Sequence, residues 1–301
     1  MRFVVGSRGS KLALAQTQWV IDKLKTISPD SDFEIRIIKT KGDKITEVAL
    51  DKIGDKGLFV KEIEEELLKG GIDLAVHSMK DIPSFLPEGL AFAGVPKRED
   101  FRDALILREG LENLNDIPFG GKIGTGSKRR KYQLLNLRPD LDVVSIRGNV
   151  DTRLRKMKEM RLDGIILAAA GLKRLGLEDK ITHYFSIEEM IPAPAQGALA
   201  IEIRKSDNDI RRITEKIMDK NSEIQVKAER TFLNNLEGSC QVPVGAICVI
   251  QGEKLTLHGI FGSEDGKVLI NKSMHGSIGC ERELGRKLAE DILEELRKIE
   301  G

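Results

Sequence analysis

The chain has few aromatic residues and no long apolar run. Aromatic residues make up 4% of its 301 residues, with a single Trp. Proteins that bind single-stranded nucleic acid stack bases on aromatic side chains, so this scarcity argues against a nucleic-acid partner. No apolar run approaches the roughly 20 residues that a membrane helix needs. The N-terminus enters a short apolar run without the pattern of a signal peptide, so we expect a cytoplasmic protein without membrane contact.

Cysteine is also scarce: only Cys240, Cys248 and Cys280 occur. A low, odd number argues against a disulfide framework and for a reducing compartment. The spacing does not suit zinc or Cys-x-x-Cys redox chemistry, so we expect no metal. Glycine and proline surround Cys240 and predict a turn that presents its thiol to a cleft. Such a thiol is a nucleophile, a ligand or an attachment point, and the alternative is a small buried hydrophobic residue.

An excess of charge of one sign is missing as well. Lys and Arg number 49 against 48 Asp and Glu, which leaves a formal net charge of +1. No overall basicity therefore indicates nucleic acid or an anionic membrane as a partner, and any anion binding must come from local clusters. The length allows two or three domains, each with its own core.

Short β-branched runs alternate with helical periodicity over the first two thirds of the chain. Helical stretches are amphipathic, as where Phe59, Ile63 and Leu67 recur at four-residue steps. This alternation predicts an α/β architecture. The expected strands lie at 3–5, 33–38, 74–76, 90–95, 104–107, 143–146 and 165–168.

Two turns of the same form indicate two similar lobes. Gly6-Ser7-Arg8-Gly9-Ser10 and Gly124-Thr125-Gly126-Ser127-Lys128 each follow an apolar run and precede a helix. Such a turn brings backbone N–H groups, hydroxyls and the positive end of a helix dipole together, which favours an anion. The alternative for each turn is a simple helix cap.

Two segments, near 95–100 and 191–198, are the expected crossings between the lobes. The chain would leave the first lobe, build the second and return with a strand at 199–203. From about residue 220 the pattern changes to a helix, the Cys240 loop, three strands and a last helix. That helix carries an apolar stripe of Leu284, Leu288, Ile292, Leu296 and Ile299. We thus predict lobe 1 at 1–97 and 198–219, lobe 2 at 98–197, and a small α+β domain at 220–301.

Residues 40–57 show little periodicity. The segment is charged, contains several glycines and lies between a strand and a helix. It is either a mobile lid over a cleft or a solvated loop.

Polar side chains crowd the end of the third expected strand, in His77-Ser78-Met79-Lys80-Asp81. Ligands of open α/β sheets bind off the carboxyl ends of strands, so this crowding predicts a site. Asp81 would suit stabilising a cationic intermediate or moving a proton. The alternatives are that Asp81 only caps a turn and that His77 is a satisfied core histidine.

A second cluster is cationic. It comprises Lys128-Arg129-Arg130-Lys131 and the segment from Arg147 through Asn149 to Arg153. Arginine forks bind carboxylates in a fixed bidentate geometry. If these side chains converge with Arg8, the cleft would hold a ligand with several carboxylates. A basic face for RNA is the competing interpretation, but it lacks interleaved aromatic residues.

Seven segments together resemble the hydroxymethylbilane synthase (porphobilinogen deaminase) family in order and spacing, over nearly the full chain. They are Gly6-Ser7-Arg8-Gly9-Ser10, Lys56-Gly57-Leu58-Phe59-Val60-Lys61-Glu62, His77-Ser78-Met79-Lys80-Asp81, Arg147-Gly148-Asn149-Val150, Ala170-Gly171-Leu172-Lys173-Arg174-Leu175-Gly176, Pro194-Ala195-Gln196-Gly197-Ala198 and Glu237-Gly238-Ser239-Cys240-Gln241-Val242-Pro243.

The resemblance implies an α/β fold of two similar lobes resembling type II periplasmic binding proteins, plus the small C-terminal domain. It implies a covalent dipyrromethane cofactor held by Cys240 through a thioether. The implied reaction joins four porphobilinogen molecules head to tail, loses ammonia at each step and releases hydroxymethylbilane. Asp81 is then the essential carboxylate, which assists ammonia loss and stabilises positive charge on the pyrrole nitrogens.

The resemblance also implies residues that bind the acetate and propionate carboxylates. They are Arg8, Ser10, Lys80, Thr125, Ser127, Arg129, Arg130, Arg147, Asn149, Arg153 and Arg174. Other expected site residues are His77, Ser78, Gln196 in the hinge, and Lys56 and Lys61 at the end of the lid. The chain departs from the family pattern at Gly126, where a serine is replaced, and at Lys128, where an apolar residue is replaced.

We expect a monomer whose partner is porphobilinogen. The alternative function is a non-catalytic, two-lobed binding module for a polycarboxylate ligand, with Cys240 merely structural. A periplasmic receptor would need an export signal and has no use for a third domain with a lone thiol, so the enzyme is favoured.

Overall fold

The computed structural model describes residues 1–41, 60–83, 86–236 and 242–300. Cys240, Lys56 and all but the first two residues of the expected lid lie outside the described residues. The chain divides into two compact units, Met1–Glu99 with Ala198–Glu223, and Asp100–Gly197 with Ile224–Gly301. Because the second unit includes the C-terminal region, the three-domain boundaries remain a prediction.

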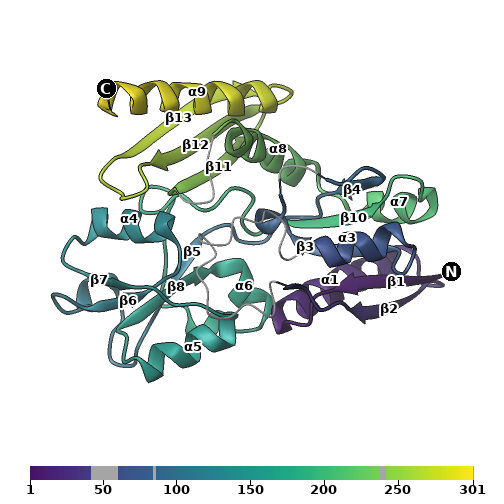
Figure 1. Cartoon of the computed structure of the whole chain (residues 1–301), viewed down its shortest axis with the longest axis horizontal. Coiled ribbons are helices and arrows are strands. Elements are labelled where there is room, and N and C mark those ends of the chain that lie inside the picture. Colours follow the sequence, from purple (N-terminus) through teal and green to yellow (C-terminus); the bar gives the residue numbers. More distant parts are fainter. Residues whose placement is uncertain (42–59, 84–85, 237–241, 301) are drawn as a thin grey trace. The chain divides into compact units, whose positions relative to one another are not determined.

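A five-stranded sheet forms the centre of the first unit (Figure 1). The strands are β1 (Arg2–Ser7), β2 (Asp32–Ile37), β3 (Leu74–Ser78), β4 (Leu90–Gly94) and β10 (Leu199–Arg204). Their order is β2-β1-β3-β10-β4, with β1 parallel to β2 and β3, and β10 antiparallel to β3 and β4. The strand expected to return to the first lobe at 199–203 is confirmed as β10.

Helices cover both faces of this sheet. They are α1 (Lys11–Ile27), α3 (Lys61–Leu68), α7 (Asn208–Thr214) and the 3-10 turn η5 (Glu215–Ile217). A second 3-10 turn, η2 (Met79–Asp81), directly follows β3. Successive strand residues face opposite sides, so Leu74 packs in the cluster that contains α1 while Ala75 packs with Ile63 of α3. Helix α3 confirms the four-residue apolar step at Ile63 and Leu67, which are fully buried.

The second unit repeats the same sheet pattern. Its strands are β5 (Asp103–Leu107), β6 (Lys122–Gly124), β7 (Asp142–Val144), β8 (Gly164–Ala168) and β9 (His183–Tyr184). In the order β7-β6-β8-β5-β9, β6 is parallel to β7 and β8, and β5 is antiparallel to β8 and β9. The expectation of two similar α/β lobes is confirmed, and β5 corresponds to β10 because each follows an expected crossing.

Short helices and 3-10 turns connect the strands of this sheet. The helices are α4 (Lys128–Leu137), α5 (Val150–Glu159), α6 (Ala169–Arg174), and the 3-10 turns η3 (Leu114–Asp116) and η4 (Glu178–Lys180). The apolar run expected to end at Gly124 is β6. The sequence did not predict β9, because two residues are too few to show a period of two.

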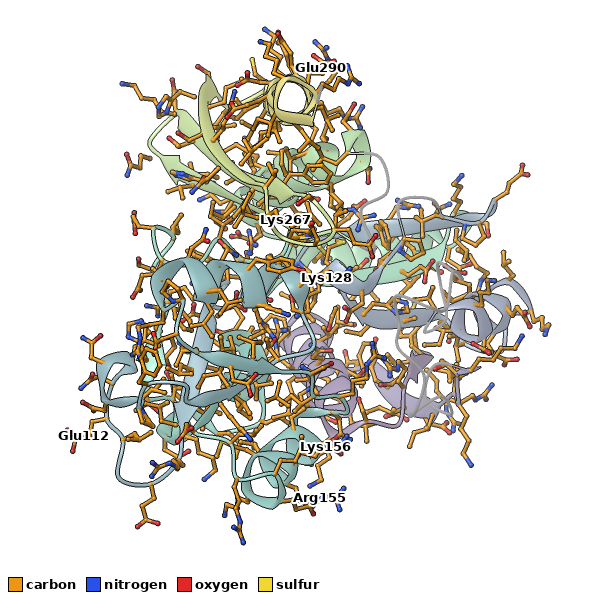
Figure 2. All side chains as sticks on the ribbon, turned by 60° about the vertical axis from the view of Figure 1, so that its left-hand side comes forward. Glu112, Lys128, Arg155, Lys156, Lys267 and Glu290 are labelled. Carbon is orange, nitrogen blue, oxygen red and sulfur yellow. The ribbon has the colours of Figure 1, made fainter. Side chains whose placement is uncertain are left out.

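The C-terminal region consists of α8 (Lys220–Asn235), the strands β11 (Val244–Gln251), β12 (Lys254–Gly262) and β13 (Leu269–Ser277), and α9 (Glu281–Glu300). Helix α9 lies along the antiparallel sheet β11-β12-β13 (Figure 1). Leu284, Leu288 and Ile292 of its stripe are buried, whereas Ile299 is 54% exposed because the apolar cluster ends at Leu296. The apolar stripe thus extends beyond the buried part of the helix. Glu290 lies on the outer side of α9 (Figure 2) and pairs there with Arg286 at 2.6 Å.

Candidate functional site

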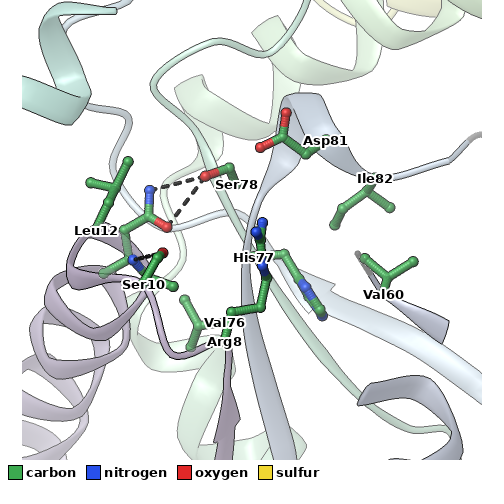
Figure 3. Close-up of a pocket in the computed structure, with 11 residues that line it drawn as sticks. Arg8, Ser10, Leu12, Val60, Val76, His77, Ser78, Asp81 and Ile82 are labelled. Atoms are coloured by element: carbon green, nitrogen blue, oxygen red, sulfur yellow. Dashed lines mark hydrogen bonds between the residues drawn. The ribbon is translucent and has the colours of Figure 1, made fainter. Parts of the chain in front are cut away.

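A pocket opens where β1 and β3 of the first unit end (Figure 3). Strand β1 ends at Ser7, directly before Arg8, and β3 ends at Ser78, directly before the η2 turn that carries Asp81. The pocket is lined by Arg8, Ser10, Leu12, Ala13, Gln16, Val60, Val76, His77, Ser78, Asp81 and Ile82. Five sequence-predicted site residues thus meet at the carboxyl ends of two parallel strands, as expected for an open α/β sheet.

Hydrogen bonds fix the polar side of this pocket. The Ser10 hydroxyl accepts the N–H of Ala13 at 3.2 Å and so caps α1. The Gln16 amide donates to the Ser78 hydroxyl at 3.0 Å (Figure 3). The helix-cap interpretation of Ser10 is therefore correct, but its hydroxyl proton is still a donor for a ligand, because capping uses only the oxygen.

Asp81 is the exposed carboxylate of the pocket. It ends the η2 turn, whose backbone is closed by the N–H of Ile82 donating to the Met79 carbonyl at 3.3 Å. Lys80 in the same turn and Lys61 at the start of α3 are exposed, and neither is among the lining residues. The structure thus brings Asp81 to Arg8 and Ser10 but does not line this pocket with the two lysines.

His77 is both a pocket residue and a buried one. It is 6% exposed, and its Nε2 lies 3.0 Å from Oε2 of Glu202, which is 1% exposed. The interpretation of His77 as a satisfied core histidine is therefore correct for its burial. Glu202 was not predicted from the sequence, since the two partners are 125 positions apart.

A buried carboxylate organises the cationic residues of the second unit. Asp103 of β5 is fully buried, and it accepts hydrogen bonds from Arg129 Nη1 at 2.6 Å and Arg130 Nε at 2.9 Å. The side-chain amide of Gln196 donates to the same carboxylate at 2.9 Å. Arg129 also donates to the carbonyl of Ile191, so this network joins β5 and α4 to the 191–197 segment.

Charge balance sets the ionisation of Asp103. Burial alone would raise the pKa of this carboxyl, but Arg129 and Arg130 hold that pKa well below its usual range. The sequence offered no signal for Asp103 beyond an acid at the start of an apolar run. The two arginines were predicted to bind ligand carboxylates, and the structure adds that both are buried and already hold this internal carboxylate.

The remaining predicted residues of this unit lie at helix ends and strand ends. Ser127 caps α4 by accepting the Arg130 N–H at 3.4 Å, and Asn149 caps α5 by accepting the Thr152 N–H at 3.0 Å. Thr125 Oγ1 accepts the Ser127 N–H at 3.2 Å. Two arginines donate to nearby carbonyls: Arg153 to Gly148 and Arg174 to Gly197, each at 2.8 Å. Arg147 is half-buried after β7.

The two departures from the family pattern have structural counterparts. A Cβ added at Gly126 would lie 2.8 Å from the Ile146 carbonyl oxygen, so this backbone accommodates glycine without adjustment. Lys128 (Figure 2) pairs at 2.9 Å with Glu264, which follows β12 and precedes β13 in the chain. The added charge is thus matched within the same unit.

The described residues hold neither a metal-site cluster nor a membrane-spanning helix. No group of three or more His, Cys, Asp and Glu side chains within them is arranged to hold a metal ion. Within the same residues, no helix is both long enough and apolar enough to cross a membrane.

Paired α/β sheets with polar groups at their strand ends define the class as a two-lobed ligand-binding fold with a C-terminal α+β region. The model of the "Porphobilinogen deaminase, dipyromethane cofactor binding domain" matches residues 3–212, and that of the "Porphobilinogen deaminase, C-terminal domain" matches residues 223–294. The chain belongs to the porphobilinogen deaminase family.

Curated relatives agree with this assignment. The chain is 58% identical to porphobilinogen deaminase of Clostridioides difficile (strain 630), with full coverage of both chains. It is 54% identical to the Clostridium novyi (strain NT) enzyme, over 98% of this chain and 100% of that one. The function expected from the sequence is confirmed: the chain is a transferase with hydroxymethylbilane synthase activity and the dipyrromethane cofactor of its family.

Solved structures are more distant. One is the probable extracellular amino-acid-binding protein ytmK from Bacillus subtilis, with 11% identity, a TM-score of 0.41 and coverage of 72% of this chain and 90% of that one. Another is the arginine-specific periplasmic binding protein STM4351 from Salmonella typhimurium, with 15% identity, a TM-score of 0.39 and coverage of 73% and 93%.

Proposed function

We propose that this chain joins four porphobilinogen molecules head to tail on a dipyrromethane primer attached to Cys240, with Asp81 as its catalytic carboxylate. The observation that carries the proposal is the pocket where Asp81, Arg8 and Ser10 meet at the ends of β3 and β1. A carboxylate beside a cation and hydroxyls suits a ligand that carries both pyrrole N–H donors and carboxylates.

The residues of this pocket fit the cofactor. Asp81 offers an acceptor for pyrrole N–H groups, while Arg8 and the Ser10 hydroxyl offer donors to side-chain carboxylates. When bound, the dipyrromethane supplies the free pyrrole carbon to which the first substrate unit is joined. Its attachment to Cys240 is part of the proposal, since that residue lies outside the described residues.

Asp81 has two tasks in this proposal. Its negative charge stabilises the positive charge that develops on a pyrrole nitrogen as ammonia leaves. Its oxygen atoms also accept the pyrrole N–H and so orient the ring toward the bond that forms. An ionised carboxylate can perform both tasks, because it carries a negative charge and its oxygen atoms accept hydrogen bonds.

The cations of the second unit bind acetate and propionate carboxylates. Among the described residues, Arg129 and Arg130 bring two positive charges to one buried carboxylate, Asp103, so this group of three carries a net positive charge. A buried charge of this kind favours an anion nearby, which a ligand carboxylate supplies. The other predicted members of this set are Lys80, Thr125, Ser127, Arg147, Asn149, Arg153 and Arg174, with Gln196 at the hinge.

The rest of the proposal concerns the organisation of the protein. We infer lobe 1 at 1–97 and 198–219, lobe 2 at 98–197 and a cofactor-bearing domain at 220–301. We further infer a cytoplasmic monomer without a nucleic-acid partner, supported by the balanced charge and the low aromatic content of the chain.

Two assays on the purified protein test the proposal. Ehrlich reagent applied to the denatured protein should give the colour of a covalent dipyrrole even before substrate is added. Porphobilinogen should then be consumed with release of ammonia and hydroxymethylbilane. A non-catalytic module would bind polycarboxylates but show neither the colour nor turnover, and that result would refute the proposal.

A further inference from the structure

Three ionisable side chains are buried on one face of the first sheet. His77 on β3, Glu202 on β10 and Glu64 on α3 are 6%, 1% and 7% exposed. Glu202 lies opposite Ala75 in the antiparallel β10–β3 pair, and Ala75 shares a sheet face with His77, two residues away. Ala75 packs in the same cluster as α3, so all three ionisable groups lie between this sheet face and that helix.

The hydrogen bonds of this cluster are incomplete. Oε2 of Glu202 lies 3.0 Å from Nε2 of His77, but Oε1 of Glu202 is buried and has no hydrogen-bond partner among the described residues. An acceptor oxygen that is removed from water without a donor is costly. A proton held close to Glu202 reduces that cost, because it lowers the negative charge in the cluster.

Glu64 is the neighbour whose protonated form is favoured. Burial and the charge of Glu202 raise the pKa of Glu64 from 4.5 to about 7, against the lowering effects of His77 and Lys61. Of the other strands that α3 contacts, β4 has no ionisable side chain, and Arg2 of β1 is paired with Glu34. Arg204 of β10 donates to the Leu67 carbonyl of α3 and is paired with Asp73 and Asp207. Two buried acids close together share protons instead of ionising together.

We propose that Glu64, Glu202 and His77 form a proton-sharing cluster beneath the Asp81 pocket, in which the two glutamates are positioning residues that set the tautomer of His77. An ionised Glu202 can only accept, so the proton of the His77–Glu202 bond lies on Nε2. With that proton on Nε2, Nδ1 is the acceptor of the ring in its neutral form. Since His77 lines the pocket, the cluster determines which hydrogen bond this ring offers to a ligand.

The first test measures melting temperature against pH. A carboxyl whose native pKa is raised favours folding below the unfolded value near 4.5 and loses that contribution as the pH rises through 7. Glu64→Gln should therefore gain several degrees in melting temperature relative to the wild-type protein between pH 5 and pH 8. Glu65→Gln is the matched control, because Glu65 on the same helix is 63% exposed and pairs with Lys69. A Glu64→Gln difference that is the same at both pH values would overturn the cluster.

The second test reads the tautomer directly. Nitrogen NMR of the wild-type protein labelled in its four histidines, with His77→Asn to assign the signal, should show His77 protonated at Nε2. A ring protonated only at Nδ1 would contradict the proposal. Neither this measurement nor the melting curves require turnover, so they decide the cluster even if the proposed function fails.

The third test links the cluster to the reaction and rests on the proposed function. The pH profile of porphobilinogen turnover should lose its inflection near pH 7 in Glu64→Gln and keep it in Glu65→Gln. An unchanged profile in Glu64→Gln would remove the positioning role, whereas absence of turnover in the wild-type protein would refute the proposed function alone.

Discussion

At the scale of single residues, the proposed role of Cys240 has the most direct test. Cys240→Ser should fold but carry no covalent dipyrrole, because a serine hydroxyl is a far weaker nucleophile than a thiolate. Peptide mass mapping checks this, with the exposed Cys280→Ser as the control that keeps the adduct. The normal adduct on the Cys240→Ser protein would exclude Cys240 as the tether.

A variant of Asp81 distinguishes cofactor binding from turnover. Asp81→Asn keeps the shape of the side chain but removes its charge, so the protein should fold and hold the cofactor while kcat falls about 10²- to 10⁴-fold. Steady-state kinetics with porphobilinogen measure this. The exposed Glu88→Gln in the same unit is the control and should behave as wild type. Near wild-type turnover of Asp81→Asn would remove Asp81 from the mechanism.

Asp103 contributes to the stability of the fold as well as to the geometry of the site. Asp103→Asn leaves Arg129 and Arg130 buried without a counter-charge, which should cost on the order of 3–5 kcal/mol of unfolding free energy. The native pKa of Asp103 is lowered, so the wild-type advantage is full above the unfolded pKa near 3.9 and shrinks as the pH falls below it.

Denaturant unfolding at pH 7 and pH 3 measures this difference. Asp142→Asn, an exposed acid at the start of β7, is the control. Equal stability of Asp103→Asn and the wild-type protein at pH 7 would mean that the arginines do not depend on Asp103.

At the scale of elements, helix starts provide much of the predicted binding surface. Ser10, Ser127 and Asn149 each cap the helix that follows a strand end. Ser127→Ala should destabilise the protein by about 1 kcal/mol, because the Arg130 N–H loses its acceptor. Ser127→Thr keeps the acceptor and should melt near the wild-type temperature. Identical melting of the alanine variant would show that this cap contributes nothing.

Sequence reasoning reached these elements because their signals are local. Gly-Ser turns, an apolar period and a polar strand end all lie within a few neighbouring residues, as in Arg8 and Ser10 or His77 and Asp81. It missed Asp103 and Glu202 because each is defined by partners 26 or more positions away. Whether an arginine serves a ligand or an internal carboxylate depends on such distant pairing, so the sequence alone did not distinguish the two for Arg129 and Arg130.

At the scale of the whole molecule, each unit is assembled from separate stretches of chain. Residues 1–97 alone lack β10, which lies between β3 and β4 and is the one strand that pairs with β4 among the described residues. We therefore expect this fragment to show no cooperative melting. The same fragment joined to residues 198–223 through a flexible linker should melt cooperatively, as measured by circular dichroism. Cooperative melting of 1–97 alone would contradict this dependence.

The returning strand also has a consequence for synthesis on the ribosome. Strand β3 leaves the ribosome early, but β10, which pairs with one of its edges, is translated only after the entire second lobe. At about 5–20 residues per second, the nascent chain carries this unpaired apolar edge for on the order of ten seconds. An edge strand that waits this long is a site where chaperones bind or nascent chains associate. The position of β10 in the chain thus exposes the strand next to Asp81 to aggregation before the first lobe can close.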